Sequence, residues 1–168
     1  MHPGINSLLF GMSMLLMSPC TVQAAQSGKT NLKIHGTIEV IECVINDGES
    51  KEINFGDAVG IHRVDGIRYK KPVPFSVQCT NTEGGEIPDL TLTIEGEKTS
   101  FDAAAVRTNV DDFGIQLQNN DTPVELNKEI TFKLSSVPVL SAVPVRNSKA
   151  ELEAKDFYAT VKLVVGVA

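Results

Sequence analysis

The chain has 168 residues and a formal net charge of −6 at pH 7. This acidic balance argues against nucleic acid as a partner, because the phosphates of nucleic acids recruit basic surfaces. Two tyrosines and no tryptophan also leave the chain poor in the aromatic platforms that are common at sugar-binding sites. Its length is that of a single domain with a sizeable core.

The first 24 residues have the pattern of a secretory signal peptide. An apolar run over residues 5–17 is too short to span a bilayer, and the Val-Gln-Ala sequence of residues 22–24 is a pattern that signal peptidase accepts. No Lys or Arg precedes this run. We expect residues 1–24 to be removed during export. Cys20 would leave with them, since Pro19 stands where a lipoprotein signal needs a small Gly or Ala.

Two cysteines, Cys43 and Cys79, remain after this cleavage. An even pair in an exported chain indicates a disulfide rather than metal ligands. Closing a loop of about 36 residues removes roughly 4 kcal/mol of unfolded-chain entropy, a sizeable share of the stability of a small domain. The sequence therefore predicts an oxidising compartment.

Along the remaining chain the dominant hydrophobic period is two, which is typical of half-buried strands. Turn signals rich in Asn, Asp and Gly separate the alternating segments. We predict strands at residues 32–40, 75–79, 90–94, 113–117, 130–134, 137–145 and 157–165. Residues 148–155 are predicted to form a helical turn. Short strands at this spacing predict an all-β, antiparallel sandwich of immunoglobulin type.

A search for catalytic or metal-binding residues is mostly negative. Only His35 and His62 remain after export, too few for the His clusters of copper or zinc oxidoreductases, and no Gly-x-Ser-x-Gly motif accompanies them. Acidic groups without EF-hand spacing are typical of solvated surface rather than of paired catalytic carboxylates or calcium ligands. The groups considered are Asp111 with Asp112, and Glu151 with Glu153 and Asp156. We predict no enzyme activity, no cofactor and no metal.

Five motifs in order resemble the subunits of chaperone-usher fimbriae. The first is the run Leu-Lys-Ile-His-Gly-Thr-Ile-Glu-Val-Ile-Glu-Cys-Val-Ile-Asn over residues 32–46, in which a glycine precedes the cysteine by seven positions. The others lie at residues 53–57, 75–79, 113–117 followed by 122–126, and 156–160. The resemblance covers essentially the whole exported chain, and it is strongest to minor or adaptor subunits of systems like the P pilus or type 1 fimbria. One departure is Val167, where family members usually carry a tyrosine.

The resemblance implies an incomplete immunoglobulin-like sandwich, a pilin fold that ends after its sixth strand and is completed by a donated strand. A periplasmic chaperone would fill the resulting groove first. At the outer-membrane usher, the amino-terminal extension of a neighbouring fimbrial subunit would then replace it. In this chain residues 25–42 correspond to the extension and residues 43–168 to the pilin domain. The inward residues of the donor strand would be Leu32, Ile34, Gly36 and Ile38.

The extension has a second interpretation, because the same alternation fits an ordinary first strand packed in its own domain. The final strand is also open to two interpretations, a chaperone-facing strand or a plain edge of the core. By the resemblance its residues line the groove or the core beneath it, and the terminal carboxylate anchors the chaperone. These residues are Phe157, Ala159, Val161, Leu163, Val165 and Ala168.

The resulting hypothesis is a structural subunit that is exported through the periplasm into a fimbrium on the cell surface. The alternative is a small tip adhesin that binds a host glycan or another surface receptor and itself carries the donor strand. A secreted enzyme is disfavoured by the missing catalytic constellation.

Overall fold

A computed structural model describes residues 28–37, 40–80 and 88–168. The predicted signal peptide and Ile38 lie outside these residues. The chain divides into two units, Met1–Thr37 and Ile38–Ala168. In the described part of the first unit, residues 28–37 form no strand or helix, and every residue is exposed.

In the described part of the second unit the regular elements are strands, apart from two short 3-10 helices, as the period of two predicts. Its elements in chain order are β1 (Cys43–Ile45), η1 (Asn46–Gly48), η2 (Ile61–Arg63), β2 (Lys71–Pro72), β3 (Val77–Cys79), β4 (Leu90–Glu95), β5 (Ala105–Arg107), β6 (Phe113–Asn119), β7 (Thr122–Pro123), β8 (Glu129–Phe132), β9 (Leu140–Arg146) and β10 (Lys162–Val167). In the residues that the structure describes, no helix is long and apolar enough to cross a membrane.

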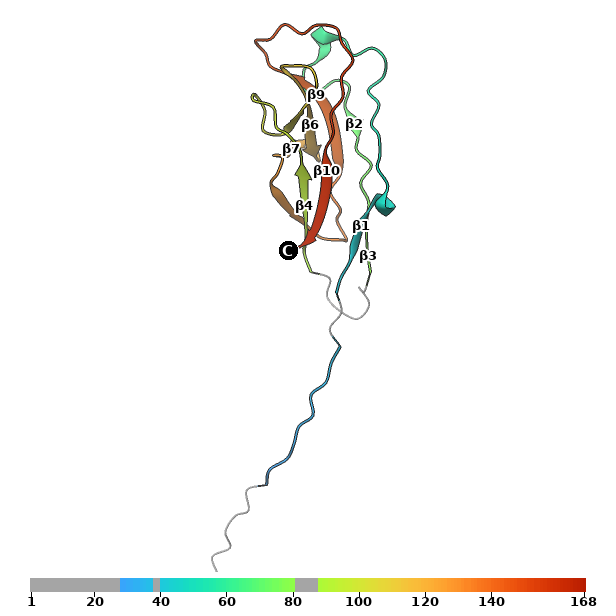
Figure 1. The fold of residues 1–168 in the computed structure, drawn as a ribbon, viewed down its shortest axis with the longest axis vertical. Helices are drawn as coiled ribbons and strands as arrows, with labels where there is room; N and C mark the ends of the chain where they lie inside the picture. Colours follow the sequence, from blue (N-terminus) through green and yellow to red (C-terminus); the bar gives the residue numbers. More distant parts are fainter. Residues whose placement is uncertain (1–27, 38–39, 81–87) are drawn as a thin grey trace, which may run out of the picture. The chain divides into compact units, whose positions relative to one another are not determined.

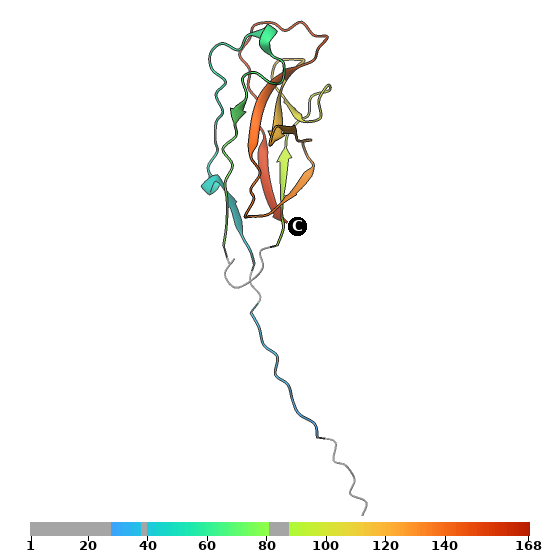
Figure 2. The same cartoon turned by 180° about the vertical axis from the view of Figure 1, so that it is seen from behind.

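The strands form two main sheets and a short ribbon (Figure 1). One sheet has the order β10-β4-β8, the other the order β2-β9-β6-β5, with β7 added to β6, and β1 pairs with β3 in the ribbon. Every one of these strand pairs is antiparallel. The all-β, antiparallel architecture expected from the sequence is therefore confirmed. Seen from behind, the long orange strand β9 lies in front of the red strand β10 (Figure 2).

The core lies between the two main sheets, where alternate residues of the central strands meet. On β4 the inward residues Leu90, Leu92 and Ile94 are fully buried, and on β6 Ile115 and Leu117 face the same core. The intervening threonines of β4 are only half-buried. Strand residues point alternately to opposite faces of a sheet, so a period-two sequence puts all its large aliphatic side chains on the buried face.

The structure differs from the sequence prediction at two places near the carboxyl terminus. Residues 148–155 form no helix beyond a turn at Ser148 and Lys149, and β10 begins at Lys162 rather than at Phe157. Leu152 and Phe157 pack against the core from this irregular segment. Tertiary burial of these two side chains takes precedence over the weak local preference for a helix.

Asn46 holds the end of β1 against the chain that leads into β3. It is 8% exposed and has a left-handed backbone (φ 48°), which Asn tolerates better than most residues. Its Nδ2 donates to the carbonyl of Pro74 at 2.9 Å, and its Oδ1 accepts from the amide of Ser76 at 2.9 Å. One side chain thus makes two hydrogen bonds to main-chain groups that would otherwise pair with a neighbouring strand.

We expect Asn46→Ala to lower the free energy of unfolding by about 1 to 3 kcal/mol, because it removes two part-buried hydrogen bonds, one to the carbonyl of Pro74 and one from the amide of Ser76. Urea denaturation of both proteins measures the difference. Asn54→Ala is the matched control. The side chain of Asn54 is exposed and, among the residues that the structure describes, accepts only from the amide of Gly56, so its loss should change stability by less than about 1 kcal/mol. Equal effects of the two substitutions would contradict the role of Asn46.

Candidate functional site

Strand β10 has hydrogen-bonded neighbours on one side only in the described part of the chain. It pairs with β4 from Lys162 opposite Glu95 to Val167 opposite Leu90. β1 pairs with β3 and with no other described strand. β1 and β10 lie close together, yet no ladder joins them. Unpaired strand edges of this kind are ready to accept another strand.

The inward side chains beside these two edges are only partly buried. On the β10 side they are Phe157, Val161, Leu163 and Val165. On the side of β1 and its partner β3, the partly buried side chains that pack against the same core are Cys43, Ile53, Phe55, Phe75 and Val77. The inward residues of β4 are completely buried by contrast. We call this half-buried apolar stripe between the β1 and β10 sides the groove. Its exposure is what an incomplete sandwich leaves behind.

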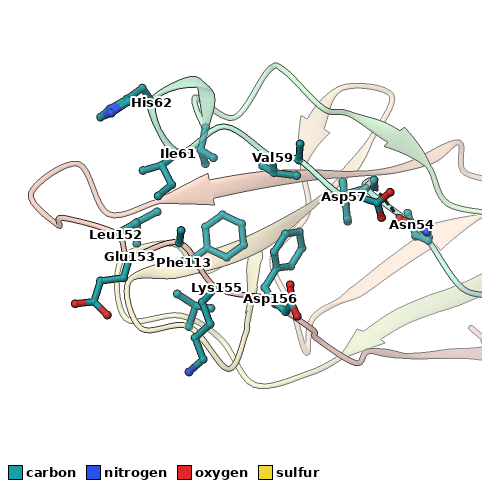
Figure 3. A pocket seen from close by; sticks show the side chains of 18 of the residues that line it. Asn54, Asp57, Val59, Ile61, His62, Phe113, Leu152, Glu153, Lys155 and Asp156 are labelled. Atoms are coloured by element: carbon teal, nitrogen blue, oxygen red, sulfur yellow. Dashed lines mark hydrogen bonds between the residues drawn. The ribbon is translucent and has the colours of Figure 1, made fainter.

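An open pocket of about 880 Å³ lies at one end of this groove. Its two sides are the chain that precedes η2 and the chain that precedes β10, as Figure 3 shows with Asn54, Asp57 and Val59 on one side and Leu152 and Asp156 on the other.

Three aromatic rings form the base of this pocket. Phe157 lies 4.8 Å from Phe113 and 5.9 Å from Phe55 between ring centroids. Both are tilted or edge-on contacts, the arrangements that aromatic pairs prefer. The base of the pocket is therefore an apolar surface of aromatic rings in contact.

The rim of the pocket is acidic. It carries the exposed carboxylates of Glu52, Asp57, Glu153 and Asp156, against one ammonium group, that of Lys155. None of these four carboxylates forms an ion pair with any residue that the structure describes. His62 also lies on the rim (Figure 3).

Asn109 fixes the side of the pocket that precedes β10. Its side chain accepts from the amide of Tyr158 at 2.8 Å and donates to the carbonyl of Asp156 at 3.1 Å, and its own amide donates to the carbonyl of Tyr158 at 3.3 Å. The segment from Asp156 to Tyr158 is thus held by hydrogen bonds although it belongs to no sheet.

The predicted disulfide is present. Cys43 and Cys79 are bonded to each other and lie directly opposite in the β1–β3 pair. The cross-link joins the two strands of the ribbon beside the groove.

The residues predicted to form the donor strand are exposed where the structure describes them. Leu32 is 82% and Ile34 87% exposed, and a Cβ atom at Gly36 would meet nothing within 4 Å. Ile38 lies outside the described residues.

The predicted residues of the final strand lie in and before β10. Leu163 and Val165 belong to β10, Phe157 and Val161 precede it, and all four pack against the core. Ala159 is exposed. Ala168 is also exposed, and its amide donates to the carbonyl of Asp89 at 2.8 Å.

The acidic groups that the sequence raised as metal ligands form no such site. Asp111 lies 3.7 Å from Arg107. Within residues 28–37, 40–80 and 88–168, no group of three His, Cys, Asp or Glu side chains is arranged to hold a metal ion.

Sequence reasoning missed the pocket. The base residue Phe55 lies in one of the motifs noted above and Phe113 begins another, but nothing in the sequence brings these motifs together. Asn109 carries no sequence signal at all.

A family model described as "Fimbrial protein" matches residues 32–167. The chain belongs to this family. It is also 32% identical over 158 residues to the fimbrial-like protein YfcQ of Escherichia coli K12, an alignment that covers 90% of this chain and 95% of that protein. The fimbrial-like protein YfcR of the same organism is 27% identical to this chain over 178 residues. This alignment covers 98% of each of the two proteins.

Solved pilus subunits have the same fold. The match to the P pilus adaptor subunit PapF covers 75% of this chain and 95% of the PapF chain, with a TM-score of 0.52 and 23% sequence identity. The match to a subunit of a chaperone-usher pilus covers 87% of this chain and 99% of that subunit's chain, with a TM-score of 0.56 and 15% sequence identity. The predicted fold class and the resemblance to pilin subunits are confirmed, and the family is one of structural subunits of the extracellular fimbrium.

Proposed function

We propose that this fimbrial subunit polymerises by strand donation, with a strand from a neighbouring subunit filling the groove beside β10. The observation that supports this is the half-buried apolar stripe along an unpaired strand edge. A strand added there gains backbone hydrogen bonds and inserts alternate side chains between the β1 and β10 sides, which is the recognition mode called β-augmentation.

The amino-terminal extension, residues 25–42, is the matching donor that this chain offers to its own neighbour. Its exposed Leu32 and Ile34 alternate with polar residues, and Ile38 continues the pattern. Burying these three aliphatic side chains contributes roughly 5 to 9 kcal/mol before the cost of ordering the strand. Their exposure supports donation over the ordinary first strand that the sequence left open.

Before assembly, the same groove would be filled by a periplasmic chaperone, and the usher would then exchange the chaperone strand for the donated one. Phe157, Val161, Leu163 and Val165 form the subunit's contact with either strand. The exposed Ala168 would present the terminal carboxylate to the chaperone. Export through the periplasm and a place as a minor or adaptor subunit belong to the same proposal.

The test is to add a donor peptide to the purified subunit and follow its thermal unfolding. A synthetic peptide spanning residues 25–42, added at about one hundred times its dissociation constant, should stabilise the subunit by about 2.7 kcal/mol and raise Tm by about 9 °C. Donor peptides from the neighbouring subunits of the same assembly are tested beside it. A peptide of the same composition in scrambled order, which loses the alternation, is the control.

The outcome that would overturn the proposal is equally specific. If neither this peptide nor those of the neighbouring subunits shifted Tm, and the isolated subunit were a stable monomer, the sandwich would need no further strand. Strand donation would then have to be abandoned.

A further inference from the structure

The acidic rim of the pocket affects which donor strand the groove accepts. This inference rests on the proposed function of strand donation. Four carboxylates against one ammonium group leave the rim with a formal charge of −3. These carboxylates are exposed and have no ion-pair partner among the described residues. Their charge is therefore available to whatever enters the pocket.

The direction of the donated strand decides which of its ends meets this rim. All strand pairs in the described chain are antiparallel, and the two sheets of an immunoglobulin-type sandwich are antiparallel throughout. A strand that extends the β10 sheet in the same way runs opposite to β10. Its carboxyl-terminal end then lies beside the chain that precedes β10, where Phe157 and the acidic rim are.

The chain's own extension has the wrong charge at that end. Residues 32–42 and residues 157–167 are equally long, so an antiparallel pairing that places Leu32 beside Val167 places Glu42 beside Phe157. The acidic residues Glu39 and Glu42 would then approach Glu153 and Asp156. The basic residues of the extension, Lys29 and Lys33, would lie at the far end of the groove.

We propose that the groove selects a donor strand whose carboxyl-terminal half carries Lys or Arg, and that it disfavours the extension of a second copy of this chain. The occupant is therefore an extended, alternating apolar segment of a different subunit, with basic residues at the pocket end. Like charges placed side by side at an interface suppress the wrong partner, while complementary charges accelerate the encounter with the right one. The subunit would then separate two other subunits in the pilus and would not form a homopolymer.

The test compares two peptides for binding to the purified subunit. The first is the natural sequence of residues 25–42, and the second carries Glu39→Lys and Glu42→Lys. At 20 mM salt we expect the second peptide to bind about tenfold more tightly. Each exposed charge pair contributes only a fraction of a kcal/mol, so several pairs together give a difference of about this size. At 0.5 M salt the difference should largely vanish, because exposed charges are then screened within a few ångströms.

Two controls locate the effect at the rim. A peptide with Gln26→Lys and Ser27→Lys adds two positive charges at the opposite end of the strand and should gain less than twofold. A subunit with Glu153→Gln and Asp156→Asn should lose much of its preference for the lysine peptide. The hydrogen bonds of Asn109 to the Asp156–Tyr158 segment involve only main-chain atoms of that segment, so they remain possible in this variant.

The outcomes distinguish the two proposals. If both peptides bind equally at low salt, or the variant subunit keeps its full preference, charge selection at the rim is wrong while strand donation stands. If Gln26→Lys and Ser27→Lys raise the affinity of the peptide as much as Glu39→Lys and Glu42→Lys do, the attraction comes from the overall charge of the subunit and not from the rim. If no donor peptide binds at any salt concentration, strand donation itself fails, and the charge preference falls with it.

Discussion

Replacing Cys43 and Cys79 together by alanine is expected to lower the free energy of unfolding by about 4 kcal/mol. The disulfide closes a loop with a sequence separation of 36, and its loss restores the entropy of that loop to the unfolded chain. The effect is large for this fold, because in the described part of the chain the ribbon that the cross-link joins pairs with neither main sheet. Denaturation in guanidinium chloride measures the change.

Reduction of the unaltered protein provides the control for this prediction. Dithiothreitol breaks the cross-link but keeps both sulfur atoms, which pack against the core, so it separates the loss of the bond from the loss of side-chain volume. We expect reduction to account for most of the 4 kcal/mol. A loss below about 1 kcal/mol in both experiments would show that the ribbon is held by its packing alone.

Gly36→Leu is expected to slow or weaken strand donation by about tenfold to a hundredfold. If Gly36 enters a shallow part of the groove, a leucine side chain there overpacks it at a cost of about 1 to 3 kcal/mol, and each 1.4 kcal/mol is a factor of ten. A Cβ atom at this position meets nothing within 4 Å in the structure. The substitution should therefore leave the stability of the subunit and its capture by the chaperone unchanged.

Gly28→Leu is the matched control, because a Cβ atom at Gly28 also meets nothing within 4 Å. It lies outside the predicted inward residues of the donor strand and should donate normally. Formation of SDS-resistant complexes between subunits measures both variants, with the acceptor being whichever subunit takes up the natural extension. Unimpaired donation by Gly36→Leu would exclude the shallow-pocket role of this glycine.

The sequence by itself determined the class of fold and the position of most strands. The alternation in β4 and β6 predicts which face of each strand is buried, since side-chain direction repeats every two residues regardless of the neighbours. Pairing of Cys43 with Cys79 followed from an even number of cysteines in an exported chain. In β10 the burial does not alternate, since Leu163, Val164, Val165 and Gly166 are all half-buried.

Only the tertiary structure decided where the pocket lies and what surrounds it. Its base joins Phe55, Phe113 and Phe157, which are far apart in the sequence, and its acidic rim comes from the two separate segments 52–57 and 153–156. The helical turn predicted for residues 148–155 is limited to a turn at Ser148 and Lys149 for the same reason, since Leu152 and Phe157 pack against the core. Local periodicity reports the direction of a side chain, but packing between distant segments decides its neighbours.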